Sequence, residues 1–264
     1  MSTVDRLLNV LGLFTLDRPK WTVEAAAAEL DMTVSTAYRY FKSLVDAGLV
    51  AADTPRHYTL GPGIIEYDRQ MRLRDPLIVT AAPIMRRLAS KVGTDAMVLL
   101  CRLYRRRVLC VHQEISGTRA FHTHWEADQP IIYQRGQPMP LHRGAPSKAI
   151  LAYMKARQVR PIHEAEAEAW RQADLGENWI AVKRNLRLLR NQKVIVTSGE
   201  ISDNTIGVAV PIMMDQTGVI GSLSIILPPD RGDGPAADMD DALIAAARDI
   251  ELGLRLEAQD GSDA

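Results

Sequence analysis

The sequence predicts a mixed α/β (α+β) protein built from two parts of different character. The first 60 residues have the pattern of three helices followed by a short hairpin. From residue 95 onward, strand patterns and helix patterns mix, and a charged helix pattern over residues 62–76 separates the two parts. We therefore expect one domain at residues 1–61, a linker helix at 62–76 and a second domain at 77–264.

Composition sets limits on the kind of protein this is. Lys plus Arg and Asp plus Glu each number 32, so any contact with nucleic acid has to come from locally placed charges. No apolar run approaches the roughly 20 residues that span a bilayer, so we expect no membrane partner. The N-terminus carries Asp5 and lacks a small-residue cleavage site, which argues against a signal peptide. With only two cysteines, a cytoplasmic protein without disulfides is expected.

The N-terminal part contains three helix patterns, each with its own start signal. Their capping residues are, in order, Ser2 or Thr3, then Thr22, then Thr33 or Ser35. Gly48 follows the third helix at the position of a left-handed C-terminal cap. Beyond it, two short strands around a polar turn at residues 53–57 predict a hairpin.

The third helix pattern has one apolar face and one polar, positively charged face. Its core side carries Val34, Ala37, Phe41 and Leu44. Its other side has the donors and charges that a helix needs in the major groove of DNA. With its neighbours, this pattern predicts a winged helix-turn-helix, and the order of elements disfavours a plain amphipathic surface helix. The expected DNA contacts are Thr33, Ser35, Thr36, Tyr38, Arg39 and Lys42 on the helix and Arg56 at the hairpin tip.

The second part alternates strands and helices. A long helix is predicted to end at Gly93, and two strands, 97–103 and 108–114, flank a turn at residues 105–107. The remaining expected strands are 120–125 and 131–133, both weak, and 194–197, 205–213 and 219–227. The remaining expected helices are 147–155, 161–173, 179–191 and 238–257.

Four segments, taken in chain order, resemble the IclR family of bacterial transcriptional regulators. They are MTVSTAYRYFKSLVDAGLV, the wing end Tyr58-Thr59-Leu60-Gly61, GQPMPLHRGAPSKAILAYM, and GEISDNTIGVAVPIMMDQTGVIGSLSIILPPDR. Together they extend the resemblance over essentially the whole chain. Two departures concern the expected ligand site: Ser147, preceded by Pro146, stands where the family usually has Gly, and Lys193 stands where it often has Gly. Pro146 has no N–H to offer a ligand.

The resemblance implies several properties that the residues alone do not show. The second domain should be a GAF-like effector-binding domain, and the chain should bind double-stranded operator DNA. It should form homodimers through the DNA-binding half, often as dimers of dimers. The effector should be a small organic acid or an aromatic compound. No cofactor is expected.

The start of the helix after Gly144 is the expected effector site. Backbone N–H groups and the positive end of the helix dipole converge there, which suits a carboxylate, and the Ser147 hydroxyl can replace the donor missing at Pro146. Gly207 is expected to leave space for the ligand. The alternatives are an ordinary capped helix and plain core positions. The predicted effector residues are Ile131, Tyr133, His142, Gly144, Ala145, Ser147, Thr205 and Gly207.

Other functions find less support in the sequence. An enzyme would need a catalytic motif, and the chain has no G-x-S-x-G, P-loop, G-x-G-x-x-G or H-E-x-x-H pattern; a pure dimerisation adaptor is the third possibility. His122 and His124 share a strand face but lack a third metal ligand, so no metal site is predicted. Cys101 and Cys110 should face each other across a turn at Arg105-Arg106, either as a redox pair or, more in keeping with a reducing compartment, as buried thiols. We expect a ligand-responsive regulator that controls the catabolism of a small organic or aromatic acid.

Overall fold

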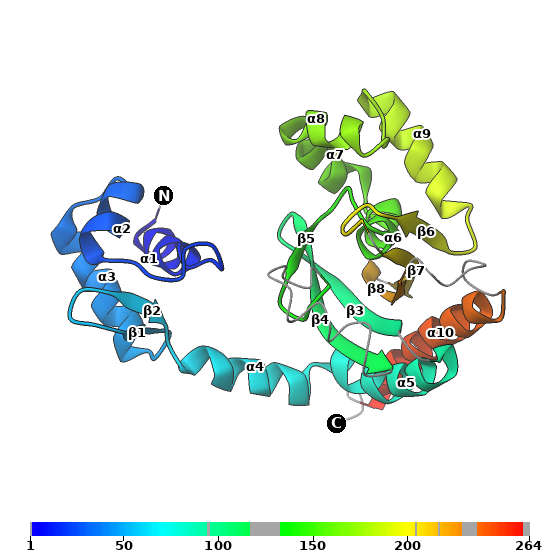
Figure 1. The fold of residues 1–264 in the computed structure, drawn as a ribbon, viewed down its shortest axis with the longest axis horizontal. Coiled ribbons are helices and arrows are strands. Elements are labelled where there is room, and N and C mark those ends of the chain that lie inside the picture. Colours follow the sequence, from blue (N-terminus) through cyan, green and yellow to red (C-terminus); the bar gives the residue numbers. More distant parts are fainter. Residues whose placement is uncertain are drawn as a thin grey trace. The chain divides into compact units, whose positions relative to one another are not determined.

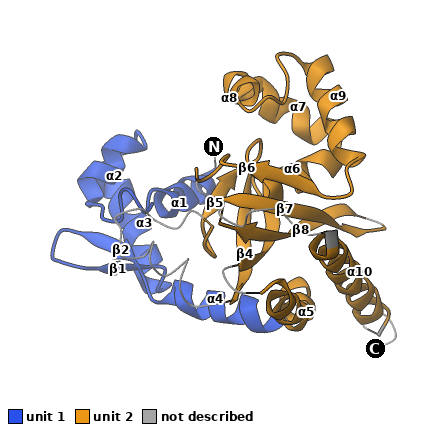
Figure 2. Cartoon of the chain, turned by 45° about the vertical axis from the view of Figure 1, so that its right-hand side comes forward, with its two compact units in different colours: residues 1–75 blue, residues 76–264 orange. Residues whose placement is uncertain are grey.

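The chain divides into two compact units, Met1–Asp75 and Pro76–Ala264 (Figure 2). Its computed structural model describes residues 2–93, 96–116, 133–203, 205–215, 217–228 and 237–260. No helix within these ranges is long and apolar enough to cross a bilayer. The strand predicted at 120–125, with His122 and His124, lies outside them, as do Ile131 and Ile132 of the strand predicted at 131–133.

The first unit is a winged helix-turn-helix followed by one more helix. Its elements are α1 (Thr3–Gly12), α2 (Val23–Glu29), α3 (Val34–Asp46), β1 (Val50–Ala52), β2 (Tyr58–Leu60) and α4 (Gly63–Arg74). The caps act as the sequence predicts: the side chains of Ser2, Thr22 and Thr33 each accept a backbone N–H three residues further on. Short polar side chains therefore fix where the first three helices of this unit begin.

Two glycines place the wing against the end of α3. Gly48 has φ +70°, the left-handed conformation expected of a C-terminal cap. At Gly61 an added Cβ would lie 2.3 Å from the Gly48 carbonyl oxygen, so no larger residue fits there. The Gly61 N–H donates to the Leu49 carbonyl, and the tilted rings of Phe41 and Tyr58 pack together with their centroids 4.8 Å apart. The hairpin and the recognition helix thus share one core.

The second unit is a six-stranded antiparallel sheet covered on both faces (Figure 1). The strand order is β5-β4-β3-β8-β7-β6. The strands are β3 (Ala96–Tyr104), β4 (Arg107–Ser116), β5 (Pro138–Pro140), β6 (Ile195–Ser198), β7 (Ile206–Met214) and β8 (Gly218–Leu227). The helices are α5 (Pro76–Val92), α6 (Ala145–Tyr153), α7 (Ala156–Ala165), α8 (Ala167–Gln172), α9 (Trp179–Arg190) and α10 (Ala237–Asp260).

Strand β3 lies near the middle of the sheet and contributes side chains to the hydrophobic cores on both faces of the sheet. Val98 and Leu100 pack with α5 and α10, which lie side by side on one face. Met97, Leu99 and Cys101 pack with α6, α7 and α9 on the other face. Successive side chains of a strand point to opposite faces, so a strand covered on both sides needs the continuous apolar run seen here.

Two secondary-structure predictions differ from the structure. The single helix expected at 161–173 is two helices, because the backbone turns at Glu166, with φ −130°, between α7 and α8. The prediction placed Pro161 at a helix start, where proline is favoured. The structure starts α7 at Ala156 instead, and a cap in which the Lys155 N–H donates to the Gln158 side chain precedes it.

The cysteine pair has the predicted arrangement. Tyr104 pairs with Arg107 around the two-residue turn, and Cys101 faces Cys110 between β3 and β4. Both thiols are buried. The hydrogen bond with Cys110 and burial raise the pKa of the Cys101 thiol well above its ordinary value, so this thiol stays protonated and a poor nucleophile.

Candidate DNA-binding helix and effector pocket

The polar face of α3 is open to solvent. Ala37, Phe41 and Leu44 are buried against the rest of the unit, as predicted. Val34 was expected on that core face, and this is wrong: it is 50% exposed, because it is the first helical residue and lies at the edge of the buried face. Of the predicted contacts, Thr36 is half-buried, and the others are exposed: Thr33, Ser35, Tyr38, Arg39, Lys42 and Arg56.

Among the described residues, the cations of this face and of the hairpin tip have no acidic partner. Within the described ranges, no ion pair joins Arg39, Lys42 or Arg56 to a carboxylate, whereas Lys20 of the same unit pairs with Asp53. Arg18 pairs with Glu29 and stacks on Trp21. Unpaired cations on an exposed helix keep their charge available for phosphates and base edges.

The predicted anion site at the start of α6 already holds a carboxylate of the chain itself. The Gly144 N–H donates to Glu200 Oε2 at 2.8 Å, and Lys148 Nζ lies 2.5 Å from Glu200 Oε1. The next N–H, that of Ala145, donates to Thr197 Oγ1 at 2.9 Å. The donors that we expected to hold a ligand are therefore satisfied by β6 and by the segment that follows it.

Gly207 does not leave the space that the sequence suggested, and this expectation is corrected. A Cβ there would lie 3.2 Å from Ala145 Cβ and 3.3 Å from Thr197 Oγ1. The start of α6 packs directly on β7, so the absent side chain makes room for a helix rather than for a ligand. Ser147 is fully buried and its hydroxyl has no hydrogen-bond partner among the described residues.

A cavity of about 480 Å³ opens beside this helix start. That volume lies within the range of about 300–1,000 Å³ typical of small-molecule sites. It is lined by His142, Arg143, Ala169, Gln172, Ala173, Asp174, Ser198, Gly199 and Glu200. Of the predicted effector residues that the structure describes, only His142 lines it, with Gly144 two positions further along the chain. The best hint in the sequence was that Arg143 and Glu200 fall inside the segments that resemble the IclR family.

Two predicted residues near this cavity have shifted pKa values. Burial is the main cause of a lowered pKa of His142. The carboxylate of Glu166, whose Oε2 lies 3.6 Å from Nδ1, opposes this shift. The His142 ring is therefore largely neutral at pH 7. Burial also raises the pKa of Tyr133 to about 12, opposed by its hydrogen bond with Thr205. The Tyr133 hydroxyl is therefore protonated at neutral pH and available as a donor.

The fold and the exposed helix define a DNA-binding transcriptional regulator. Its second domain contains a cavity large enough for a small molecule. Two family descriptions match the chain: the IclR helix-turn-helix domain over residues 3–54, and the bacterial transcriptional regulator IclR C-terminal domain over residues 73–252. The chain therefore belongs to the IclR family. It is a regulator rather than an enzyme, since both domains are those of regulators.

Known relatives resemble the chain along most of its length. It is 24% identical to the HTH-type transcriptional regulator BhcR of Paracoccus denitrificans over 254 residues, 95% of this chain and 86% of that protein. KipR of Bacillus subtilis is 23% identical, covering 84% of each. An IclR-family regulator from Brucella abortus has the same fold, with TM-score 0.73, 22% identity, and 95% and 91% of the chains covered. An IclR homolog from Microbacterium hydrocarbonoxydans complexed with 4-hydroxybenzoate has TM-score 0.69 and 23% identity, covering 97% of this chain and all of that one.

Replacing Arg39 with Ala should weaken specific DNA binding by about 1–3 kcal/mol, because an exposed and unpaired guanidinium on α3 is lost. A gel-shift titration with the promoter region beside the gene measures the effect. The control is Arg157→Ala, which removes the same charge from an exposed position on α7. Equal affinities for wild type and Arg39→Ala would remove Arg39 from the interface.

Replacing Lys148 with Met should lower the free energy of unfolding by about 1–3 kcal/mol, since it leaves the Glu200 carboxylate with one donor fewer in a partly buried site. Lys193→Met is the matched control. Its partner Asp241 and Lys193 itself are both more than half exposed, so their ion pair should contribute less than about 1 kcal/mol. Urea unfolding of both variants makes the comparison, and equal losses would contradict it.

Proposed function

We propose that the chain is a ligand-responsive regulator whose effector is a small carboxylate, and that it controls genes for the catabolism of such an acid. One observation carries the proposal: the start of α6 binds a carboxylate already, that of Glu200. The same carboxylate lines the cavity of about 480 Å³. A site that holds one carboxylate through a backbone N–H and an ammonium group has the chemistry to hold another.

Exchange of Glu200 for an effector carboxylate is sterically and electrostatically reasonable. The Glu200 side chain is 27% exposed and belongs to the connection between β6 and β7, so it can turn to solvent. Lys148 and the Gly144 N–H would then face the ligand. Since the chain's own acid must be displaced, charge alone contributes little net affinity. The rest of the ligand has to bury surface in the cavity to reach micromolar binding, about 8 kcal/mol.

An aromatic acid suits this cavity better than a very small one. Next to the charged groups lie the neutral His142 ring and the apolar side chains of Ala169 and Ala173. The 4-hydroxybenzoate in the related Microbacterium structure is an acid of this class. An effector that binds the DNA-competent and incompetent states with different affinity would shift the balance between them.

Glu200→Gln should bind 4-hydroxybenzoate about tenfold more tightly than wild type, because glutamine keeps the shape but removes the competing charge. Calorimetry with 4-hydroxybenzoate and with 4-hydroxybenzamide measures the effect of the Glu200 charge and shows whether the ligand must be charged. Asp203→Asn removes a nearby exposed charge of the same connection and should leave the affinity unchanged. The proposal fails if the neutral amide binds as tightly as the acid, or if Glu200→Gln binds more weakly than wild type.

We also propose that the chain acts as a homodimer or dimer of dimers that pairs through its DNA-binding half. A single helix-turn-helix reads few base pairs, and two-fold pairing extends the reading. Helix α4 has no buried residue, yet it exposes four large apolar side chains: Ile65, Tyr67, Met71 and Leu73. Such a surface is typical of an interface.

Met71→Glu should shift sedimentation equilibrium at micromolar concentration toward a smaller species, since a charge in an apolar interface loses its hydration. Gln70→Glu introduces the same charge one position away on a polar side of α4 and should leave the distribution unchanged. A monomeric wild type, or an unaltered distribution in Met71→Glu, would contradict pairing through this helix.

A further inference from the structure

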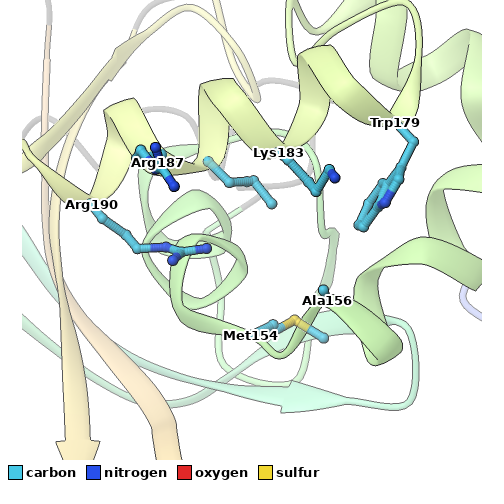
Figure 3. A pocket seen from close by; sticks show the side chains of 7 residues that line it. Met154, Ala156, Trp179, Lys183, Arg187 and Arg190 are labelled. Atoms are coloured by element: carbon cyan, nitrogen blue, oxygen red, sulfur yellow. The ribbon is translucent and has the colours of Figure 1, made fainter.

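A second, smaller cavity lies between α9 and the junction of α6 with α7. Its volume is about 220 Å³. It is lined by Met154, Ala156, Trp179, Lys183, Leu186, Arg187 and Arg190 (Figure 3). It shares no lining residue with the cavity beside Glu200, so it is a separate site.

The apolar side of this cavity fits one ring. Met154 and Leu186 are buried, and Trp179 is half-buried with its ring 6.0 Å from the His163 ring, which supports it from behind. Figure 3 shows Trp179 at one end of the cavity and Met154 across from α9. A flat indole and a thioether are good contacts for an aromatic ring. Since a cavity of about 150 Å³ can hold benzene, this one can hold a ring with a small substituent.

Three cations of α9 border the same cavity. Lys183, Arg187 and Arg190 are spaced by four and three residues, so they share one face of the helix. Arg190 Nε donates to the Ala152 carbonyl at the end of α6, which orients its guanidinium. In the described part of the chain, Lys183 and Arg187 form no ion pair.

Lys183 and Arg187 differ in this respect from two cations of the adjoining helices. Arg160 of α7 pairs with Glu164, and Arg171 of α8 pairs with Glu168. Opposite charges at these spacings stabilise a helix. Like charges at i, i+4 repel, so the α9 pair is tolerated at a cost that a bound anion would remove.

We propose that this cavity is a second ligand site, for a single-ring aromatic carboxylate. The ring would lie between Trp179 and Met154, and the carboxylate would meet Lys183 and Arg187. The apolar lining argues against the phosphate of a nucleic acid as the ligand, because a phosphate group has no ring to place between Trp179 and Met154. The site is independent of the effector cavity proposed above.

Fluorine NMR of the full chain carrying 5-fluorotryptophan tests the site directly. The chain has four tryptophans, and Trp179→Phe identifies the signal of Trp179 by its loss. Benzoate should move that signal in a saturable way, whereas benzamide, of the same shape without the charge, should not. A Trp179 signal that benzoate leaves in place, or that benzamide moves equally, overturns the proposal.

Matched variants then test the charges. Lys183→Gln combined with Arg187→Gln should raise the benzoate Kd read from the Trp179 signal about tenfold or more. Arg184→Gln removes an exposed charge from α9 outside the cavity and should change that Kd less than about twofold. Equal effects of the two changes would show a diffuse charge effect and overturn the site.

Arg143→Gln separates this site from the other cavity. It removes the arginine beside Glu200 and should leave the Trp179 titration as in wild type. Loss of the Trp179 shift in Arg143→Gln would mean that the shift is relayed from the first cavity, and the second site would be overturned. A failure of the effector proposal, by contrast, would leave the Trp179 titration intact.

Discussion

The carboxylate of Glu200 at the start of α6 is the interaction on which the second unit depends. Helix α6 is buried over almost its whole length, so the N–H groups of its first turn cannot reach water, and the chain itself must supply acceptors for them. Glu200 and Thr197, more than 50 residues further along, provide two of these acceptors. The Ser222 hydroxyl of β8 donates to the Pro146 carbonyl and so fixes the peptide group between Pro146 and Ser147. Helix, sheet and connection are thereby held at one point.

In the proposed function, that same point would make the unit responsive to acids. In the liganded state that we propose, Glu200 has turned away from the helix start and the carboxylate of the effector has taken its place. Glu200 would then satisfy the helix start in the absence of a ligand and set the affinity that a ligand must exceed. Affinity then depends on the apolar part of the ligand, while charge selects its class.

The sequence predicts what depends on neighbours along the chain. Ser2, Thr22 and Thr33 cap their helices through residues three positions away, and Cys101 faces Cys110 because a two-residue turn sets the register. Distant contacts are not visible in this way. Gly207 packs against Ala145 of α6, and Glu200 binds the Gly144 N–H 56 positions away, so both contacts join segments that are distant in the sequence. Strand β5 lies at the edge of the sheet and has prolines at both ends, so the strand propensities of its residues do not predict it.

The distribution of unpaired cations extends this reasoning to function. With equal numbers of acidic and basic residues, composition gives no sign of an anion-binding surface. In the described ranges, several cations on helices have an acid beside them, as Arg160 and Arg171 do. Arg39 with Lys42 on α3 and Lys183 with Arg187 on α9 do not. A bound anion can neutralise such unbalanced charge. On α3 we expect that anion to be the DNA backbone, and on α9 we propose a small organic acid in the adjoining ring-sized cavity.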